Sequence, residues 1–360
     1  MTQVQEHGGD IYSASYRLDY SVSVNPSGTP NSVRHAVIRS TGVLEQYPDI
    51  KCRDLRRKLS DRLCLPAHWI TCGNGAAGLI FASALARHPQ HALLICPGFS
   101  EYEKALRAAG CGDIRFYRCA RENGFRVRED ILEQITEEID MMYLCNPANP
   151  TGILVEPGLV LQILKRCRER DVLLVVDECF LELTAKPQEH TLLGYVADNP
   201  NLLVLRSFTK TYAMPGVRLG FCVTSGKDLS DCIHDSMQPW PVSTPAQMAG
   251  EAALEEEEEY LKESRALIVR ELRYMKQTFE RIGIRCYDSD ANFLLFEGPE
   301  HLPQLCAKKG ILIRDCRNYR GLGPGYYRVA VRTRRDNEEL CGILSDIFRT
   351  TGHYLTDSLG

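Results

Sequence analysis

The sequence predicts an α/β protein, with a large domain built on a mostly parallel sheet and a smaller α/β domain. Short, wholly apolar runs alternate with amphipathic stretches through the middle of the chain. The runs lack the polar alternation of half-exposed strands, which is typical of parallel strands covered on both faces. The chain of 360 residues also exceeds one typical domain, so a second, smaller unit is expected.

Five apolar runs in the middle of the chain are expected to be strands of the large sheet. Amphipathic stretches separate them, and this repeated strand-then-helix order is typical of α/β domains. Pro157 stands at the expected start of one helix, a position that suits proline. The expected strands are 91–97, 140–147, 171–178, 201–208 and 219–225. The expected helices are about 75–87, 99–109, 128–138 and 157–170.

The pattern along the chain divides it into three segments. Residues 1–40 have little periodicity and should form an N-terminal arm and a segment of the small domain. Residues 41–283 should form the large domain, which ends in a charged helical stretch. The acidic run 255–259 in that stretch is expected to be a solvated helix face. Residues 284–360 should form a small C-terminal domain with antiparallel strands, combined with the N-terminal segment.

Charge and hydropathy argue against two classes of partner. The chain has 43 Lys and Arg against 47 Asp and Glu, a net charge of −4, whereas a general nucleic-acid binder shows a strong basic excess. No stretch approaches the roughly 18 consecutive apolar residues of a membrane helix. The N-terminus, MTQVQEHGGD, lacks the basic and then apolar pattern of a secretory signal. We therefore expect a cytoplasmic protein with neither nucleic acid nor membrane as its partner.

Fifteen cysteines are spread from Cys52 to Cys341. No two form a C-x-x-C pair, and none joins a Cys/His cluster at metal-binding spacing. An odd count in a chain without a secretory signal argues against a disulfide framework. Most cysteines lie in apolar surroundings, so we expect reduced, buried side chains and no metal site.

The most specific chemical signal is the stretch SFTKTYAMPGVR at the end of an expected strand. Two hydroxyl residues, Ser207 and Thr209, precede and flank Lys210, and Arg218 follows eight residues later. Pyridoxal phosphate chemistry needs a lysine that forms a Schiff base. It also needs hydroxyls and a guanidinium that hold a phosphate dianion. A lone lysine after a strand is commonly a solvated surface residue, but the complete pattern is more specific.

Two further side chains follow neighbouring expected strands. Asp177 ends one apolar run, and the carboxyl end of a buried parallel strand points into the crevice where ligands bind. It could hold a pyridine nitrogen protonated, or it could simply cap a helix. The stretch NPANPTG after the preceding strand is a rigid turn that could aim Asn149 at a cofactor, or it could be an ordinary tight loop.

A glycine-rich turn, TCGNGAAG, opens the helix expected at about Gly75. The free N–H groups of a helix start form an anion site. A glycine before a helix is commonplace, so this signal is weak by itself. It gains weight because it precedes the other motifs in a consistent order.

The order GNGAAG, PGFSEY, NPANPTG, VVDE and SFTK…R resembles the fold-type I pyridoxal-phosphate enzymes of the class I/II aminotransferase family, over essentially the whole chain. The resemblance implies that the cofactor is pyridoxal 5'-phosphate. It implies that Lys210 is the Schiff-base lysine and Asp177 the partner of the pyridine nitrogen. Asn149 would bond the phenolate oxygen, and Tyr102 would stack on the ring. The residues implied to bind the phosphate are Gly75, Ala76, Ser207, Thr209 and Arg218.

The same resemblance carries two statements about the surroundings of the cofactor. Tyr47 in EQYPD is similar to a tyrosine that reaches the phosphate of the neighbouring subunit, which implies a homodimer. Phe180 stands where many members of the family place a tyrosine on the phenolate. The missing hydroxyl removes one means of tuning the Schiff base.

The reaction depends on the residues that bind the anionic groups of the substrate. By holding these groups, the protein selects which bond at Cα is broken. Two arginines, Arg314 and Arg328, lie on expected C-terminal strands, and strand arginines make rigid bidentate sites unless they are surface charges. Within the family, HGGD, QYPD, MQPWPVSTPAQ and IRDCRNYRGLG are most similar to the branch that decarboxylates L-threonine O-3-phosphate in cobalamin biosynthesis. That branch also has phenylalanine at the position of Phe180.

This likeness implies an amino-acid phosphate as the small-molecule substrate. Arg328 would bind its carboxylate and Arg314 its phosphate, while His7 and Gly8 of the arm would close over the phosphate. Asn149 would also touch the substrate. Ser23 would lie near it, at a position where this branch usually has asparagine. An aminotransferase acting on a phosphorylated compound such as histidinol phosphate, and a regulator that only keeps the fold, are the alternatives.

Overall fold

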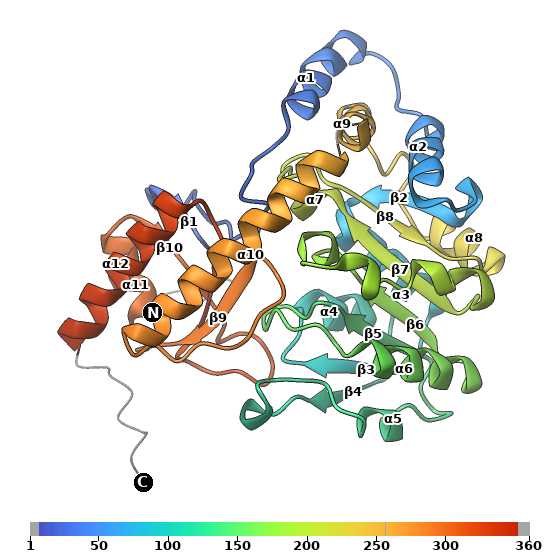
Figure 1. Cartoon of the computed structure of the whole chain (residues 1–360). Helices are drawn as coiled ribbons and strands as arrows, with labels where there is room; N and C mark the ends of the chain where they lie inside the picture. The colour runs from blue at the N-terminus through green and yellow to red at the C-terminus, as the bar shows by residue number, and fades with distance from the viewer. Residues whose placement is uncertain (1–6, 256, 352–360) are drawn as a thin grey trace.

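The computed structural model describes residues 7–255 and 257–351. Its largest element is a seven-stranded sheet of order β2–β8–β7–β6–β5–β3–β4, as Figure 1 shows. Strands β3 to β7 run parallel, and β8 is antiparallel to both β7 and β2. The predicted mostly parallel sheet is confirmed. Its strands are β2 Ile70–Asn74, β3 His91–Cys96, β4 Asp113–Arg118, β5 Met141–Cys145, β6 Leu173–Asp177, β7 Leu202–Ser207 and β8 Leu219–Val223.

The large sheet is apolar on both faces because helices cover both. On one face, Leu94, Tyr143 and Val175 pack against α3, α4 and α8. On the other, Met142 and Val176 pack against α2, α5, α6 and α9. Successive strand residues point to opposite faces, so double coverage requires the continuous apolar runs seen in the sequence. The helices are α2 Arg53–Leu63, α3 Gly75–Arg87, α4 Ser100–Ala108, α5 Ile131–Gln134, α6 Pro157–Glu169, α8 Lys227–Asp235 and α9 Thr244–Glu255.

The C-terminal segment builds a second, antiparallel sheet with its own core. In order β11–β12–β9, it contains Arg314–Asp315, Tyr326–Ala330 and Phe293–Glu297. Strand β1 (Leu18–Asp19), from the N-terminal segment, pairs in parallel with β10 (Ile311–Leu312). Figure 1 shows β1, β10 and β9 beside the C-terminal helices. The helices here are α10 Glu257–Arg281, α11 Leu302–Lys308 and α12 Arg334–Thr351.

Some elements differ from the sequence-based expectation. Helix α1 (Asn31–Ser40), which packs on α9, and strands β2 and β4 were not predicted. The helix expected over 128–138 is a single turn, α5. Residue 256 of the acidic run lies outside the described residues, as do 1–6 and 352–360 of the two terminal segments. Among the described helices, none has the length and apolar character needed to cross a membrane.

Candidate active site

The carboxyl ends of β5, β6 and β7 meet the start of α3 around a cavity of about 420 Å³. Ligands of open parallel sheets bind at this edge. Residues from the N-terminal arm and from the C-terminal sheet complete the wall. The predicted residues that line it are His7, Gly8, Ala76, Tyr102, Asn149, Asp177, Ser207, Thr209, Lys210, Arg218, Arg314 and Arg328.

Lys210 lies on α7 (Phe208–Thr211), a single helical turn that directly follows β7. The turn is held by Ser207, whose Oγ accepts a hydrogen bond from Thr209 N at 3.1 Å. Burial, and then the nearby charge of Arg328, lower the pKa of Lys210 to about 8. Within the described residues its Nζ makes no hydrogen bond or ion pair and lies 5.8 Å from the ring centre of Phe180. The structure therefore holds a half-buried amine that readily becomes neutral and nucleophilic.

Asp177 ends β6 and places a fixed carboxylate in the same cavity. Its Oδ1 accepts a hydrogen bond from Cys179 N at 2.9 Å, and its Oδ2 accepts one from Tyr102 Oη at 2.6 Å. Tyr102 stacks on Tyr143 with ring centres 4.8 Å apart. Burial and the Asp177 charge raise the pKa of Tyr102 well above its usual range, so it stays a hydrogen-bond donor.

The start of α3 forms a cradle for an anion. Gly75 has a φ of +69°, and a Cβ there would lie 2.6 Å from Arg218 Nη2, so a side chain at this position would be strained and would displace the guanidinium. Within residues 7–255 and 257–351, no side chain caps the first turn of α3, so its N–H groups can bind a ligand. The guanidinium of Arg218 lies beside these groups, and Ser207 and Thr209 line the cavity with it.

Two buried arginines face the cavity from the C-terminal sheet. Arg314 is 2% exposed and donates from Nη2 to Asn318 Oδ1 at 2.9 Å. Arg328 is 6% exposed and donates from Nη1 to Asn149 Oδ1 and from Nη2 to Ser21 O at 3.0 Å. In the part of the chain that the structure describes, Arg328 Nε has no hydrogen-bond partner. Buried guanidinium groups that face a cavity are suited to anionic ligands.

The N-terminal arm, which the structure describes from His7 onward, lies against this cavity. His7 Nε2 is 3.1 Å from Glu101 Oε1, and Lys104 Nζ is 3.0 Å from the same carboxylate oxygen. Gly8 packs against the carbonyl of Ser21. The arm therefore brings a histidine and backbone groups to the wall that also carries Arg314.

Three predicted residues do not line the cavity. Gly75 lies behind Arg218, as described above. Tyr47 is 80% exposed and stacks on Trp240, with ring centres 4.6 Å apart. Ser23 is buried, and its Oγ has no partner among the described residues.

Several lining residues were not predicted from the sequence: Ser21, Glu101, Cys145, Cys179 and Tyr319. Tyr319 donates from Oη to Asn149 Oδ1 at 3.2 Å. Cys145 and Cys179 flank Asp177 in space, and burial raises the pKa of both thiols. The spacing Asp-x-Ser of Asp19 and Ser21 is a turn-forming pattern and was a usable signal.

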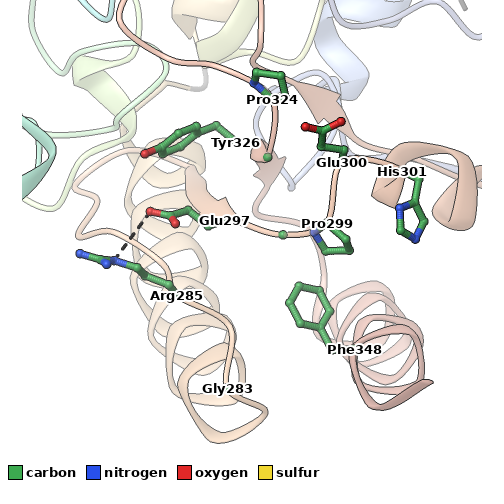
Figure 2. A pocket seen from close by; sticks show the side chains of 11 residues that line it. Gly283, Arg285, Glu297, Pro299, Glu300, His301, Pro324, Tyr326 and Phe348 are labelled. Carbon is green, nitrogen blue, oxygen red and sulfur yellow. Dashed lines mark ion pairs between the residues drawn. The ribbon is translucent and has the colours of Figure 1, made fainter. Parts of the chain in front are cut away.

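A second cavity, of about 510 Å³, lies within the C-terminal segment (Figure 2). Arg285 and Glu297 pair across one side of it at 3.7 Å, and Phe348 of α12 borders another. None of the residues predicted to act in chemistry lines it. The convergence of motifs therefore identifies the Lys210 cavity as the candidate active site.

Comparison with known proteins gives matches over nearly the whole chain. The model of the family described as aminotransferase class I and II matches residues 18–344. A threonine-phosphate decarboxylase of Salmonella typhimurium is 35% identical, over 95% of this chain and 96% of its own. A histidinol-phosphate aminotransferase of Methanococcoides burtonii is 30% identical, over 90% and 88%. The crystal structure of the histidinol-phosphate aminotransferase from Clostridium acetobutylicum superposes with a TM-score of 0.86 at 28% identity, over 92% and 99%.

Proposed function

Because the chain belongs to the class I and II aminotransferase family of pyridoxal-phosphate enzymes, we propose that the Lys210 cavity binds pyridoxal 5'-phosphate and a phosphorylated amino acid. The reaction we propose is decarboxylation of L-threonine O-3-phosphate to (R)-1-aminopropan-2-yl phosphate, in cobalamin biosynthesis. The relative from Salmonella typhimurium, described as a threonine-phosphate decarboxylase, supports this choice.

The described residues fit the cofactor. Lys210 offers an amine for its aldehyde, Asp177 a carboxylate for its ring nitrogen, and Asn149 an amide for its phenolic oxygen. Tyr102 supplies an aromatic wall. When bound, the cofactor supplies an electron-withdrawing ring that accepts the electron pair of the bond broken at Cα. The phosphate would be held by Gly75, Ala76, Ser207, Thr209 and Arg218, which the geometry around α3 supports.

The pair of buried arginines is the observation that carries the choice of substrate. Arg328 would hold the carboxylate: Asn149 and Ser21 fix its two Nη nitrogens, and its Nε has no hydrogen-bond partner among the described residues. Arg314 would hold the phosphate together with His7 and Gly8 of the arm. This arrangement fits a small molecule with an anion at each end.

Selection of the broken bond follows from how the substrate is held. Arg328 would hold the substrate carboxylate from the C-terminal sheet and so would determine which bond at Cα is presented to the cofactor. After CO₂ leaves, Lys210 or a water molecule returns a proton to Cα. The pKa of Lys210, lowered to about 8 by burial, suits this transfer near neutral pH.

Transamination of a phosphorylated compound such as histidinol phosphate is the second candidate. The likeness to the histidinol-phosphate aminotransferase from Clostridium acetobutylicum supports it. Histidinol phosphate has no carboxylate, however, so Arg328 would then serve only the keto acid that accepts the amino group.

Product analysis of the holoenzyme separates the two reactions. We expect threonine phosphate to give CO₂ and (R)-1-aminopropan-2-yl phosphate in equal amounts, with no keto acid added to the reaction. Amino transfer that depends on 2-oxoglutarate, with no CO₂ from threonine phosphate, would instead establish the aminotransferase.

We also propose that the protein is a homodimer in which Tyr47 reaches the partner's cofactor phosphate. Tyr47 and Trp240 support this, because they form an exposed aromatic pair on one chain. Sedimentation should give twice the monomer mass. Tyr47→Phe should weaken cofactor binding without changing that mass, and a monomeric holoenzyme would contradict the proposal.

A further inference from the structure

Ser21 occupies a junction between the N-terminal arm and the C-terminal sheet. It is fully buried, follows β1, and lines the Lys210 cavity. The hydroxyl and the carbonyl of this one residue contact different parts of the site. Their contacts indicate a role that neither the sequence motifs nor the proposed reaction assigns.

The hydroxyl of Ser21 holds the arm. It donates to Asp19 Oδ1 at 2.6 Å and accepts from Gly9 N at 2.7 Å. Its proton is committed to the carboxylate, which leaves a lone pair directed at the arm. Gly8 lies so close that a Cβ on it would be 2.4 Å from Ser21 O.

The carbonyl of Ser21 holds Arg328. It accepts from Arg328 Nη2 at 3.0 Å, on the arginine whose Nη1 is bonded to Asn149. The arm residue Gly8 and the arginine therefore touch the same carbonyl oxygen. Any shift of this peptide alters both contacts.

The Ser21 peptide has little freedom to move independently of these partners. Ser21 N donates to Asp19 Oδ1 at 2.8 Å. In the preceding residue, the backbone N of Tyr20 donates to Leu312 O at 2.8 Å, and the backbone O of Tyr20 accepts from Ala330 N at 2.9 Å. These bonds anchor the peptide between β10 and β12, so it is a stiff link between the arm and Arg328.

We propose that Ser21 is a positioning residue that couples closure of the arm to the placement of Arg328. The arm docks on the Ser21 hydroxyl only when the peptide lies where its carbonyl orients the guanidinium. This inference rests on the proposed function, which assigns Arg328 to the carboxylate of the substrate and the arm to its phosphate. Through this coupling, binding of the phosphate by the arm would place Arg328 for binding of the carboxylate.

The first test compares the holoenzyme with Ser21→Ala. Loss of the hydroxyl's hydrogen bonds to Gly9 N and Asp19 Oδ1 should raise KM for threonine phosphate about tenfold, with kcat changed by less than about threefold. Amide exchange at Gly9 should become faster, while cofactor absorbance stays unchanged. Ser225→Ala is the matched control, because its Oγ donates to Val196 O at 2.6 Å at a site remote from the cavity. This control should leave both readouts unaltered.

The second test measures coupling. Gly8→Ala places a Cβ against Ser21 O and should also raise KM about tenfold. If both changes break one link, the double variant resembles either single variant. A roughly hundredfold rise, the product of two independent effects, would overturn the coupling.

The third test does not depend on the substrate. Arg328→Lys removes the bond to Ser21 O and should speed amide exchange at Gly9, on the other side of the peptide. Unchanged exchange in this variant would refute the role of Ser21 even if threonine phosphate is decarboxylated. Faster exchange in an enzyme that fails to decarboxylate threonine phosphate would retain the coupling and reject only the proposed substrate.

Discussion

Arg314 and Arg328 are directly opposed partners in the antiparallel pairing of β11 with β12. Like charges opposite one another on a sheet repel, and both side chains are buried. Neutral hydrogen-bond acceptors on Asn318, Asn149 and Ser21 hold them, without a carboxylate in those bonds. Two positive charges thus lie side by side in the wall of the Lys210 cavity, an arrangement that favours anionic ligands there.

Removing Arg314 should weaken binding of the phosphate selectively. Arg314→Ala should raise KM for threonine phosphate sharply, because a lost charge-assisted contact costs about 2–4 kcal/mol. An unphosphorylated amino acid should bind almost as it does to the unaltered enzyme. Steady-state kinetics with both compounds checks this, and an equal loss on both would refute the phosphate role.

Lys210 should make the cofactor-free chain less stable at neutral pH. Its pKa is lowered to about 8 by burial, against about 10.4 for an unfolded lysine. The folded state therefore disfavours the charged amine. The resulting loss of folding stability is complete below about pH 8 and disappears as the pH rises past 10.4. Lys210→Met should stabilise the cofactor-free chain at pH 7 by on the order of 3 kcal/mol. Urea unfolding at pH 7 and pH 10 measures this difference in the free energy of unfolding. A stabilisation by Lys210→Met that is as large at pH 10 as at pH 7 would contradict the prediction.

The cradle at the start of α3 should not tolerate a side chain at Gly75. Gly75→Ala combines a positive φ with a contact 2.6 Å from Arg218 Nη2, so we expect the Kd for pyridoxal phosphate to rise more than tenfold. Gly78→Ala, one turn later in the same helix, meets nothing closer than 3.7 Å and should leave the Kd unchanged. Fluorescence titration of the cofactor-free protein measures both.

The cysteines should divide into two exposed thiols and a protected remainder. All fifteen are free; Cys64 and Cys232 are exposed, whereas Cys145 and Cys179 border the cavity with pKa values raised by burial. Iodoacetamide at pH 7.5 followed by peptide mass spectrometry should label the exposed pair first. Rapid labelling of Cys179 in the holoenzyme would show that its thiol is accessible and ionised.

The sequence predicted the fold where both strand faces are buried, because a short unbroken apolar run such as 173–177 is typical of a strand covered on both sides. It missed β4 (Asp113–Arg118), in which polar and apolar residues are mixed and most residues are only partly buried. It overestimated the helix at 128–138, where a single turn forms. Periodicity alone does not show how many turns the tertiary packing will retain.

The site was predictable where a motif fixes its own geometry. Ser207, Thr209 and Lys210 lie within one short segment, so their spacing places them together. Ser21 meets Arg328, and Tyr319 meets Asn149, only through packing of segments that lie far apart in the sequence, and no local pattern encodes that packing. The clustering of such residues required the structure.

The parallel pairing of Leu18 with Ile311 has a consequence for biosynthesis. Strand β1 leaves the ribosome early, but its partner follows only after nearly the whole chain has been translated, roughly 15–60 s later at ordinary elongation rates. The large sheet, with Lys210 and Asp177, is complete before then. During synthesis, the half of the candidate site that carries Lys210 and Asp177 is thus complete before the half that carries Arg314 and Arg328.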